Sequence, residues 1–438
     1  MEYIISQKSS SLNGNIKVPG DKSISHRALI IASMCIGTSK IDGLLESEDV
    51  FSTMSALKSL GVKIKSNDNS YFVEGVGICG FKSPNNFIDL GNSGTGIRLL
   101  LGATMGSNII VNFKGDDSLS KRPMERVLSP LRRMGANIIS SNEGKLPISI
   151  EGPKEVLPIN YTSRISSAQI KSSVLLSGLS SSGKTIFTEP NESRNHTEKM
   201  LSKFGAKISS KILENGSNVI ELEGRPLLVS KDISVPSDPS SASFPIVAAI
   251  ITPNSKIEIH NVMINQARNG LFETLQEMGA KLKISNEKKV NNEVIATINA
   301  EYSKLKGTSV PSERAPRMID EYPILSMAAA CAEGRTIMNG ISELRVKESD
   351  RIKIVSNGLN KVGIKTIEKP DSLEIFSGEI IGGCSIDSEL DHRIAMSFLI
   401  LGLVSNKPIK VLRSSTIKTS FPNFFEIMLN LGSKLVKG

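Results

Sequence analysis

The chain has 438 residues, of which 39% are hydrophobic and 22% charged, and its formal net charge is +9. This composition is that of a folded globular protein, and the length predicts two domains. The charge favours anionic partners, but the absence of tryptophan and an aromatic content of 4% argue against nucleic acid. The apolar runs are shorter than a membrane span needs, so we expect no membrane partner.

The four cysteines are widely scattered along the chain and match neither a zinc-binding spacing nor a disulfide framework. The N-terminus leads directly into a strand-like pattern, without a basic region or cleavage site. We therefore expect a cytoplasmic protein, no bound metal, and cysteines that are reduced and mostly buried: Cys35, Cys79, Cys331 and Cys384.

Residues 18–32 begin with a Pro-Gly turn, continue through polar residues and then become apolar. This order predicts a helix with a polar, open first turn and a buried body. The first N–H groups of a helix lack internal partners and carry partial positive charge. Because Lys22 and Arg27 add cations where a structural helix would place acids, we interpret this stretch as half of an anion site.

The same polar turn followed by an apolar helix recurs along the chain. A second helix in each unit ends on an apolar residue, then Gly, then a residue that leads into a strand. Glycine suits the left-handed position that closes a helix. These glycines are spaced 69 to 84 residues apart and predict six similar units: Gly61, Gly135, Gly205, Gly279, Gly363 and Gly432.

Each unit is predicted to have the order β-α-β-α-β-β. The helices with polar first turns are expected within residues 21–37, 92–106, 163–178, 238–253, 314–334 and 391–406. Residues 18–21 (Val-Pro-Gly-Asp) and 235–238 (Val-Pro-Ser-Asp) are nearly identical and indicate a duplicated half-molecule. We therefore expect an α/β protein of two domains, each with three units, and a boundary near residue 236.

Two glycine-rich segments could each be either a ligand-binding loop or an ordinary turn. Residues 178–185 match the P-loop pattern, but the segment follows a helix and enters a strand, which indicates an ordinary turn. Residues 90–98 contain Gly91, Gly94 and Gly96 before a predicted helix. A tight turn and a backbone that approaches an anion are both compatible with this segment, and its pairing with residues 18–32 favours the anion.

Cations stand at several other predicted helix starts: Arg122, Arg194, Lys347, Arg351 and Arg393. A solvated charged face is the common explanation of one such run, but recurrence in nearly every unit indicates a shared cationic cleft. If residues 345–351 are helical, Lys347 and Arg351 lie on one face and Glu348 is within reach of Arg351. Carboxylates among these cations are candidates for proton transfer: Asp320 and Glu348.

Taken together, six motifs in collinear order resemble those of the 5-enolpyruvylshikimate-3-phosphate (EPSP) synthase family, and one of them, with two further segments, resembles its bacterial class II. The motifs are residues 20–27, 91–98, 119–124, 167–169, 345–351 and 391–393, and the class II segments are residues 167–169, 194–200 and 419–422. The resemblance implies two inside-out α/β domains, each of three βαβαββ units. Their expected bounds are residues 20–236 for one domain and 1–19 plus 237–438 for the other, with a double-strand hinge near residues 20 and 236.

The resemblance implies transfer of the enolpyruvyl group of phosphoenolpyruvate to the 5-hydroxyl of shikimate 3-phosphate, with release of phosphate and no cofactor. It also implies aromatic amino-acid (chorismate) biosynthesis, inhibition by glyphosate at the phosphoenolpyruvate site, and a monomer. Asp320, Glu348 and Lys22 are the expected catalytic residues. The residues expected to hold shikimate 3-phosphate are Lys22, Ser23, Arg27, Ser167, Ala168, Gln169, Arg194, Asp320 and Lys347. Those expected to hold phosphoenolpyruvate are Lys22, Gly94, Arg122, Gln169, Arg351 and Arg393.

Two positions depart from the family pattern. Ala168 replaces a second serine, which removes one hydroxyl donor, and Lys418 precedes by one residue the place of a substrate-binding lysine, where Thr419 stands. The sister enolpyruvyl transferase that acts on UDP-N-acetylglucosamine is the nearest alternative, but residues 114–123 lack the cysteine normal for it. A basic RNA-binding scaffold is a second alternative, and it predicts exposed aromatic residues and salt-sensitive binding.

Overall fold

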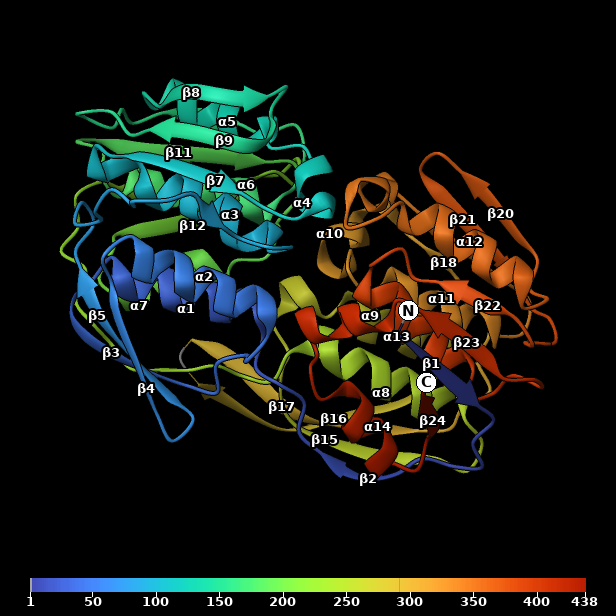
Figure 1. Ribbon diagram of the computed structural model, residues 1–438. Coiled ribbons are helices and arrows are strands. Elements are labelled where there is room, and N and C mark those ends of the chain that lie inside the picture. Colours follow the sequence, from blue (N-terminus) through green and yellow to red (C-terminus); the bar gives the residue numbers. More distant parts are fainter. Residues whose placement is uncertain (1, 291) are drawn as a thin grey trace. The chain divides into compact units, whose positions relative to one another are not determined.

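The computed structural model describes residues 2–290 and 292–438, which form two compact units. Unit 1 contains the chain up to Pro19, then Pro236–Lys289 and Glu293–Gly438. Unit 2 contains Gly20–Val235 and Val290–Asn292. Figure 1 shows the course of the chain and the element labels used below.

Six four-stranded sheets occur in the described residues, three in each unit. In every sheet a short edge strand lies parallel to its neighbour, and the next pairing is antiparallel. The predicted α/β architecture of six repeated units is therefore confirmed. The sheets of unit 2 are β14 (Ile233–Ser234), β3 (Ile36–Asp42), β5 (Ser70–Val76), β4 (Lys63–Asn67); β6 (Ile88–Asp89), β7 (Ile110–Lys114), β9 (Lys145–Glu151), β8 (Asn137–Asn142); and β10 (Asn160–Thr162), β11 (Lys184–Glu189), β13 (Asn218–Glu223), β12 (Ile208–Ile212).

The sheets of unit 1 follow the same plan, although the N-terminal strand supplies the third strand of the last sheet. This strand, β1, lies between β23 and β24 and pairs antiparallel with both. The three sheets are β2 (Asn13–Ile16), β15 (Lys256–Met263), β17 (Glu293–Glu301), β16 (Lys281–Val290); β18 (Ser309–Val310), β19 (Arg335–Asn339), β21 (Ser372–Phe376), β20 (Thr366–Lys369); and β22 (Ser385–Asp387), β23 (Ile409–Leu412), β1 (Tyr3–Gln7), β24 (Lys434–Lys437).

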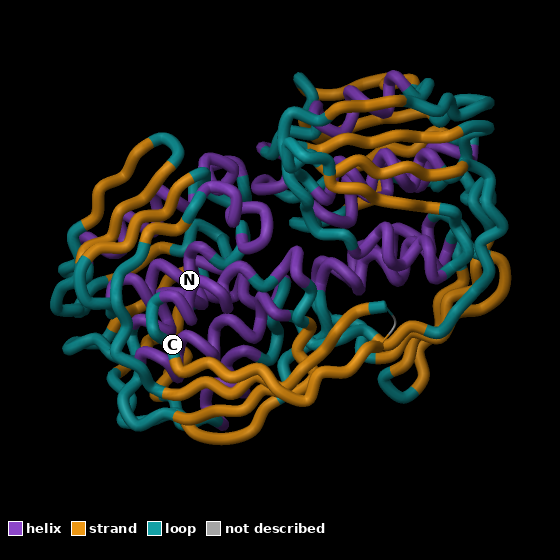
Figure 2. Tube along the Cα trace, turned by 180° about the vertical axis from the view of Figure 1, so that it is seen from behind, coloured by secondary structure: helices purple, strands orange, loops and turns teal. Residues whose placement is uncertain are grey.

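Helices occupy the interior of each unit and sheets the outside, as Figure 2 shows for helices in purple and strands in orange. In α1, for example, every residue from Ile24 to Ser33 is buried, whereas Lys22 and Ser23 are half-buried. The helices of unit 2 are α1 (Lys22–Ser33), α2 (Glu48–Ser59), α3 (Gly94–Ala103), α4 (Asp117–Lys121), α5 (Glu125–Arg133), α6 (Ala168–Gly178) and α7 (His196–Lys203). Those of unit 1 are α8 (Pro239–Ile251), α9 (Gly270–Glu277), α10 (Ala315–Met318), α11 (Tyr322–Ala330), α12 (Arg351–Lys361), α13 (His392–Leu401) and α14 (Phe424–Asn430). Five 3-10 turns complete the set: η1 (Thr104–Ser107), η2 (Gln266–Arg268), η3 (Ser312–Arg314), η4 (Ser342–Val346) and η5 (Ser414–Thr419).

The six glycines predicted to close helices all have positive φ, so the left-handed position is confirmed in every unit. Their φ values run from 90° to 107°, for Gly61, Gly135, Gly205, Gly279, Gly363 and Gly432.

The two duplicated openings exchange their first strands. Strand β2 precedes α1 in the chain but pairs with β15 of unit 1, whereas β14 precedes α8 but pairs with β3 of unit 2. The chain therefore passes between the units directly after each strand, at Pro19–Gly20 and at Val235–Pro236. On the side of unit 1, the Asp238 amide donates to the Pro19 carbonyl at 2.9 Å, so the two crossing segments lie side by side there.

Two further expectations concern local structure. The P-loop-like residues 178–185 form the turn from the end of α6 into β11, which confirms the structural interpretation. The prediction that the cysteines are mostly buried is wrong, because only Cys35 is buried and Cys79 is exposed, although all four are free. No helix among the described residues is both long and apolar enough to span a membrane.

Candidate active site

The first turn of α1 places Lys22 beside a carboxylate. Asp21 caps the helix, accepting from the Ile24 amide at 2.7 Å, and Lys22 follows as the first helical residue. The Lys22 ammonium forms an ion pair with Asp49 of α2, whose side chain is 6% exposed against 17% for Lys22. Lys22 is therefore not the bare cation that the sequence suggested. Asp49 was missed because an acid in the first turn of a helix is also typical of a purely structural helix.

Arg27, one turn further along α1, is buried and held by hydroxyl groups. Its guanidinium donates to Thr197 Oγ1 at 2.7 Å, to Ser172 Oγ at 2.8 Å and to the Ser23 carbonyl at 2.9 Å. Arg194 donates to Ser23 Oγ at 3.3 Å. The structure therefore brings the predicted residues Arg27, Ser23 and Arg194 together. It also adds Ser172 and Thr197, which were not predicted because they lie far from Arg27 in the sequence.

The start of α3 and the start of α6 meet through Arg98. This arginine donates to the Gly94 carbonyl at 3.1 Å and to Gln169 Oε1 at 3.0 Å. Because the side-chain oxygen of Gln169 accepts from Arg98, its Nε2 is free to donate to Thr95 Oγ1, at 3.1 Å. The predicted residues Gly94 and Gln169 thus lie next to each other, and Arg98 fixes the orientation of the amide.

Arg122 follows α4 and lies against the glycine-rich loop. It donates to Asn92 Oδ1 at 2.5 Å, and a Cβ atom built on Gly94 would lie 2.8 Å from its Nη1. Ser167 caps α6 by accepting from the Ile170 amide at 3.5 Å, and Ala168 is the first residue of that helix. These residues form a polar surface at the N-terminal ends of α3 and α6 in unit 2.

In unit 1, one buried arginine gathers three carboxylates. Arg351, with a side chain 1% exposed, contacts Asp391 at 2.7 Å, Glu348 at 2.6 Å and Asp320 at 3.2 Å. The expected proximity of Glu348 and Arg351 is confirmed, and Asp320 is brought in from a distant segment. Asp391 was part of a motif in the sequence, but its role as a partner of Arg351 was missed.

Residues 345–351 are not one helix. The turn η4 ends at Val346, and α12 begins only at Arg351, with Asp350 as its cap. The helical placement of Lys347 and Arg351 on one face is therefore wrong. The Asp350 side chain accepts from the Lys353 amide and competes with helix propagation before it, so the break falls between the two cations.

The electrostatics of this cluster differ between its two cations. Burial acts to lower the pKa of Arg351, but the carboxylates of Asp391, Glu348 and Asp320 outweigh it and raise that pKa. Lys347 is half-buried, and burial lowers its pKa despite the opposing effect of Asp320. Arg351 is thus a permanent cation that holds two candidate acid–base groups, Asp320 and Glu348, in one place.

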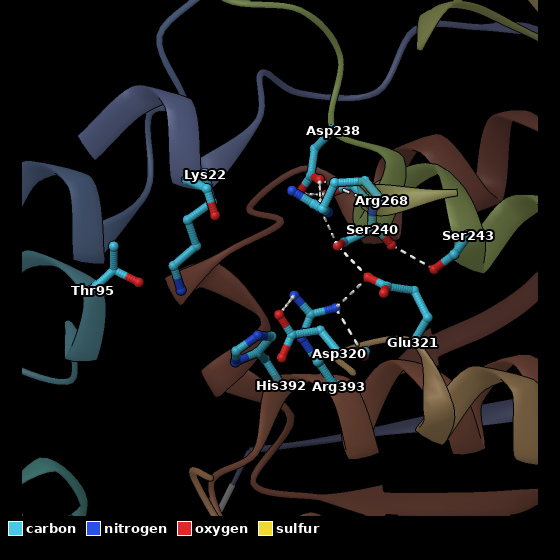
Figure 3. Close-up of polar contacts among 12 residues, drawn as sticks. Lys22, Thr95, Asp238, Ser240, Ser243, Arg268, Asp320, Glu321, His392 and Arg393 are labelled. Carbon is cyan, nitrogen blue, oxygen red and sulfur yellow. Dashed lines mark hydrogen bonds and ion pairs between the residues drawn. The ribbon is translucent and has the colours of Figure 1, made fainter. Parts of the chain in front are cut away.

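Arg393 extends the cluster toward α8, as Figure 3 shows. It donates to the Asp320 carbonyl at 3.1 Å and lies 3.7 Å from Glu321. Glu321 accepts from Ser240, which in turn accepts from Arg268 at 2.7 Å. The predicted Arg393 is therefore anchored through a polar chain whose other members were not predicted.

Near the C-terminus, η5 contains Lys418 and Thr419, the residues at and next to the place of the family's substrate-binding lysine. Lys418 is exposed, whereas Thr419 is half-buried and lies with its Oγ1 at 3.4 Å from His392 Nδ1. Within residues 2–290 and 292–438, no group of three or more His, Cys, Asp and Glu side chains is arranged to hold a metal ion.

Comparison with known proteins gives one consistent relationship. Residues 6–428 match the family model described as EPSP synthase (3-phosphoshikimate 1-carboxyvinyltransferase). The chain is 48% identical to a 3-phosphoshikimate 1-carboxyvinyltransferase of Chelativorans sp. over 434 residues, covering 98% of this chain and 97% of that relative. It is 47% identical over 436 residues to the enzyme of the same description from Parvibaculum lavamentivorans, covering 99% of this chain and 97% of that relative.

Solved structures agree. An EPSP synthase from Acinetobacter baumannii superimposes with a TM-score of 0.87 and 40% identity, covering 100% of both chains. The enolpyruvyl transferase NikO from Streptomyces tendae has a TM-score of 0.78 at 16% identity, covering 100% of this chain and 99% of that one. The second likeness shows that the fold is the one found in enolpyruvyl transferases.

Proposed function

The chain belongs to the EPSP synthase (3-phosphoshikimate 1-carboxyvinyltransferase) family, and from this premise we propose how its residues perform the transfer. The reaction joins the enolpyruvyl group of phosphoenolpyruvate to the 5-hydroxyl of shikimate 3-phosphate and releases phosphate, in the shikimate pathway. The observation that carries the assignment of roles is the position of Asp320 and Glu348, both held by the buried cation Arg351.

Shikimate 3-phosphate is bound by the polar surface of unit 2. Arg27 and Arg194 supply positive charge beside Ser23, and Ser167 and Gln169 supply donors at the start of α6. Lys22 contributes a further cation, and Asp320 and Lys347 of unit 1 complete the set. Ala168 offers only its backbone, so the sugar phosphate has one hydroxyl donor fewer than in many relatives.

Phosphoenolpyruvate is bound by cations and an amide whose positions are set by contacts within the protein. Arg122 lies against Gly94, Gln169 is held by Arg98, and Arg351 and Arg393 are anchored by carboxylates. Fixed charges of this kind stabilise developing anions without reorganisation at the moment of reaction. Lys22 lies at the start of α1, where helix N–H groups add to its charge.

The chemistry requires three proton transfers. As the 5-hydroxyl oxygen attacks C2 of phosphoenolpyruvate, its proton passes to Asp320, and the electron pair of the double bond takes a proton at C3. Glu348, assisted by Lys22, supplies that proton and gives a tetrahedral adduct that still carries phosphate. The Glu348 carboxylate then takes a proton back from the new methyl group, the double bond between C2 and C3 re-forms, and the bond from C2 to the phosphate oxygen breaks, which releases phosphate. Each step needs an acid or base at a fixed place. Arg351 holds both Asp320 and Glu348 in such places.

Three finer assignments accompany this function. Residues 167–169, 194–200 and 419–422 support membership of the bacterial class II subgroup. The reduced cysteines support a cytoplasmic location. We also expect a monomer, for which sedimentation equilibrium should give a mass near 47.2 kDa; twice that mass would contradict it.

The assignment of substrates is tested by measuring phosphate release from phosphoenolpyruvate. We expect release only when shikimate 3-phosphate is present as well, and none when UDP-N-acetylglucosamine replaces it. Release with the nucleotide sugar, or with phosphoenolpyruvate alone, would contradict the proposed acceptor.

A further inference from the structure

Unit 2 contains a cluster of buried charged side chains with no assigned role in binding or catalysis. The cluster lies close to the residues that hold Arg27 and to Arg194. Lys171 of α6 lies 2.9 Å from Glu189, at the end of β11, and 2.7 Å from Glu198 of α7. The side chains of Lys171 and Glu189 are 0% exposed, and that of Glu198 is 9% exposed. Burying three charges is expensive, and apolar residues of similar size are often at least as stable. Such a cluster therefore suggests a role in positioning.

Residues of this cluster form hydrogen bonds with the amide, the hydroxyl and the carbonyl group of Ser193. The Ser193 amide donates to Glu189 Oε1 at 3.0 Å and its hydroxyl donates to Glu189 Oε2 at 2.6 Å. The Ser193 carbonyl accepts from Lys171 at 3.1 Å. With every polar group of Ser193 engaged, the backbone that continues into Arg194 has little freedom.

A second path leads from the cluster to Arg27. Glu198 follows Thr197 in the first turn of α7, and Lys171 precedes Ser172 in α6. The hydroxyls of Thr197 and Ser172 are 2.6 Å apart, and both accept hydrogen bonds from Arg27. The neighbours of two cluster residues are therefore the partners that hold Arg27.

We propose that Lys171, Glu189, Glu198 and Ser193 form a positioning cluster that sets Arg194 and Arg27 for shikimate 3-phosphate. None of the four touches the substrate; they act by fixing α6, α7 and residues 189–194 to one another. Burial raises the pKa of Glu198 and outweighs the opposing effect of Lys171 beside it. The inference rests on the proposed role of Arg194 and Arg27 in binding this substrate.

The test is a double-mutant cycle between Ser193→Ala and Arg194→Ala, read as KM for each substrate. We expect Ser193→Ala alone to raise KM for shikimate 3-phosphate about three- to tenfold, the size of one lost hydrogen bond, with KM for phosphoenolpyruvate nearly unchanged. In the Arg194→Ala background the same substitution should have no further effect on KM, because the residue it positions is gone.

Ser173→Ala is the matched control, since Ser173 lies in α6 near Lys171, is buried like Ser193, and its hydroxyl has no hydrogen-bond partner among the described residues. It should leave both KM values unchanged. Glu189→Gln, which keeps the shape but removes the charge, is a second probe in case Ser193→Ala unfolds, and its effect should likewise vanish with Arg194→Ala. Equal effects in both backgrounds, or none in either, would overturn the proposal. If Arg194→Ala itself leaves KM for shikimate 3-phosphate unchanged, the proposed binding role of Arg194 fails instead.

Discussion

His26 is a fully buried residue between two cations of α1. Its Nδ1 lies 2.8 Å from Thr53 Oγ1, and burial, reinforced by Lys22 and Arg27, lowers its pKa well below 6.5. The folded protein therefore keeps this imidazole neutral at a pH where the unfolded chain would bind a proton.

This lowered pKa predicts a loss of stability in mild acid. Below about pH 6.5 the unfolded state gains the proton first, so each further pH unit should lower the free energy of unfolding by ~1.4 kcal/mol until the folded state also titrates. Urea unfolding at pH 7 and at pH 5.5 should show this loss, and His26→Gln should reduce it. His260→Gln is the control, because that side chain is 41% exposed. An unchanged pH dependence in His26→Gln would contradict the interpretation.

At the residue scale, the sequence indicated most of the side chains that meet in each unit but not what holds them. Lys22, Arg27, Arg194 and Arg351 stand out because cations at helix starts are unusual. Their partners lie far away in the chain: Asp49, Thr197, Ser172 and Asp391. Such tertiary contacts follow from how repeated units pack, which local patterns do not specify.

At the scale of elements, a side chain at the first residue of α3 would collide with neighbouring side chains in their present positions. A Cβ atom on Gly94 would lie 2.8 Å from Arg122 Nη1 and 3.0 Å from Arg98 Nη1. Both contacts are to the ends of flexible side chains, so the helix can accept alanine if the guanidinium groups move. Gly94 therefore sets the position of Arg122 as well as the space left for a ligand.

Gly94→Ala should weaken phosphoenolpyruvate binding through Arg122 and weaken glyphosate, expected at the same site, more strongly. We expect KM for phosphoenolpyruvate to rise about tenfold, equivalent to ~1.4 kcal/mol, with KM for shikimate 3-phosphate nearly unchanged. The inhibition constant of glyphosate should rise by a larger factor, because the inhibitor is longer than the substrate. Equal inhibition of the two proteins would show that position 94 is not the steric filter.

Helices were the most predictable elements, because their signals are local. Polar caps such as Asp21 of α1, and glycines with positive φ such as Gly61 after α2, are encoded in a few neighbouring residues. Residues 347–350 were the exception, since a charge pattern compatible with a helix is interrupted by the cap of α12 at Asp350. The break was not predictable from spacing alone, because Asp350 is also tolerated within a helix.

At the scale of the whole molecule, the duplication of Val-Pro-Gly-Asp and Val-Pro-Ser-Asp predicted a domain boundary near residue 236. The exchange of β2 and β14 was not predicted, because pairing with a distant strand leaves no local signal in four or two residues. Because of this exchange, the chain passes between the two units at Pro19–Gly20 and again at Val235–Pro236. We propose that these crossings serve as a hinge.

If the crossings are a hinge, ligands that need residues of both units should change the molecule's dimensions. Small-angle scattering should give a smaller radius of gyration with shikimate 3-phosphate and glyphosate than without ligand. Inorganic phosphate at the same concentration is the control and should cause little change. A radius of gyration that stays constant under saturating ligand would count against the hinge.

The central claim is that Arg351 holds Glu348 where it protonates the methylene carbon of phosphoenolpyruvate. The direct measurement is the turnover of Glu348→Gln with both substrates saturating, beside calorimetric binding of shikimate 3-phosphate. Loss of a general acid predicts a fall in kcat of about 10²- to 10⁴-fold with binding nearly intact, while Glu301→Gln, at the end of β17, should keep its activity. A Glu348→Gln enzyme with turnover close to that of the unmodified protein would contradict the claim.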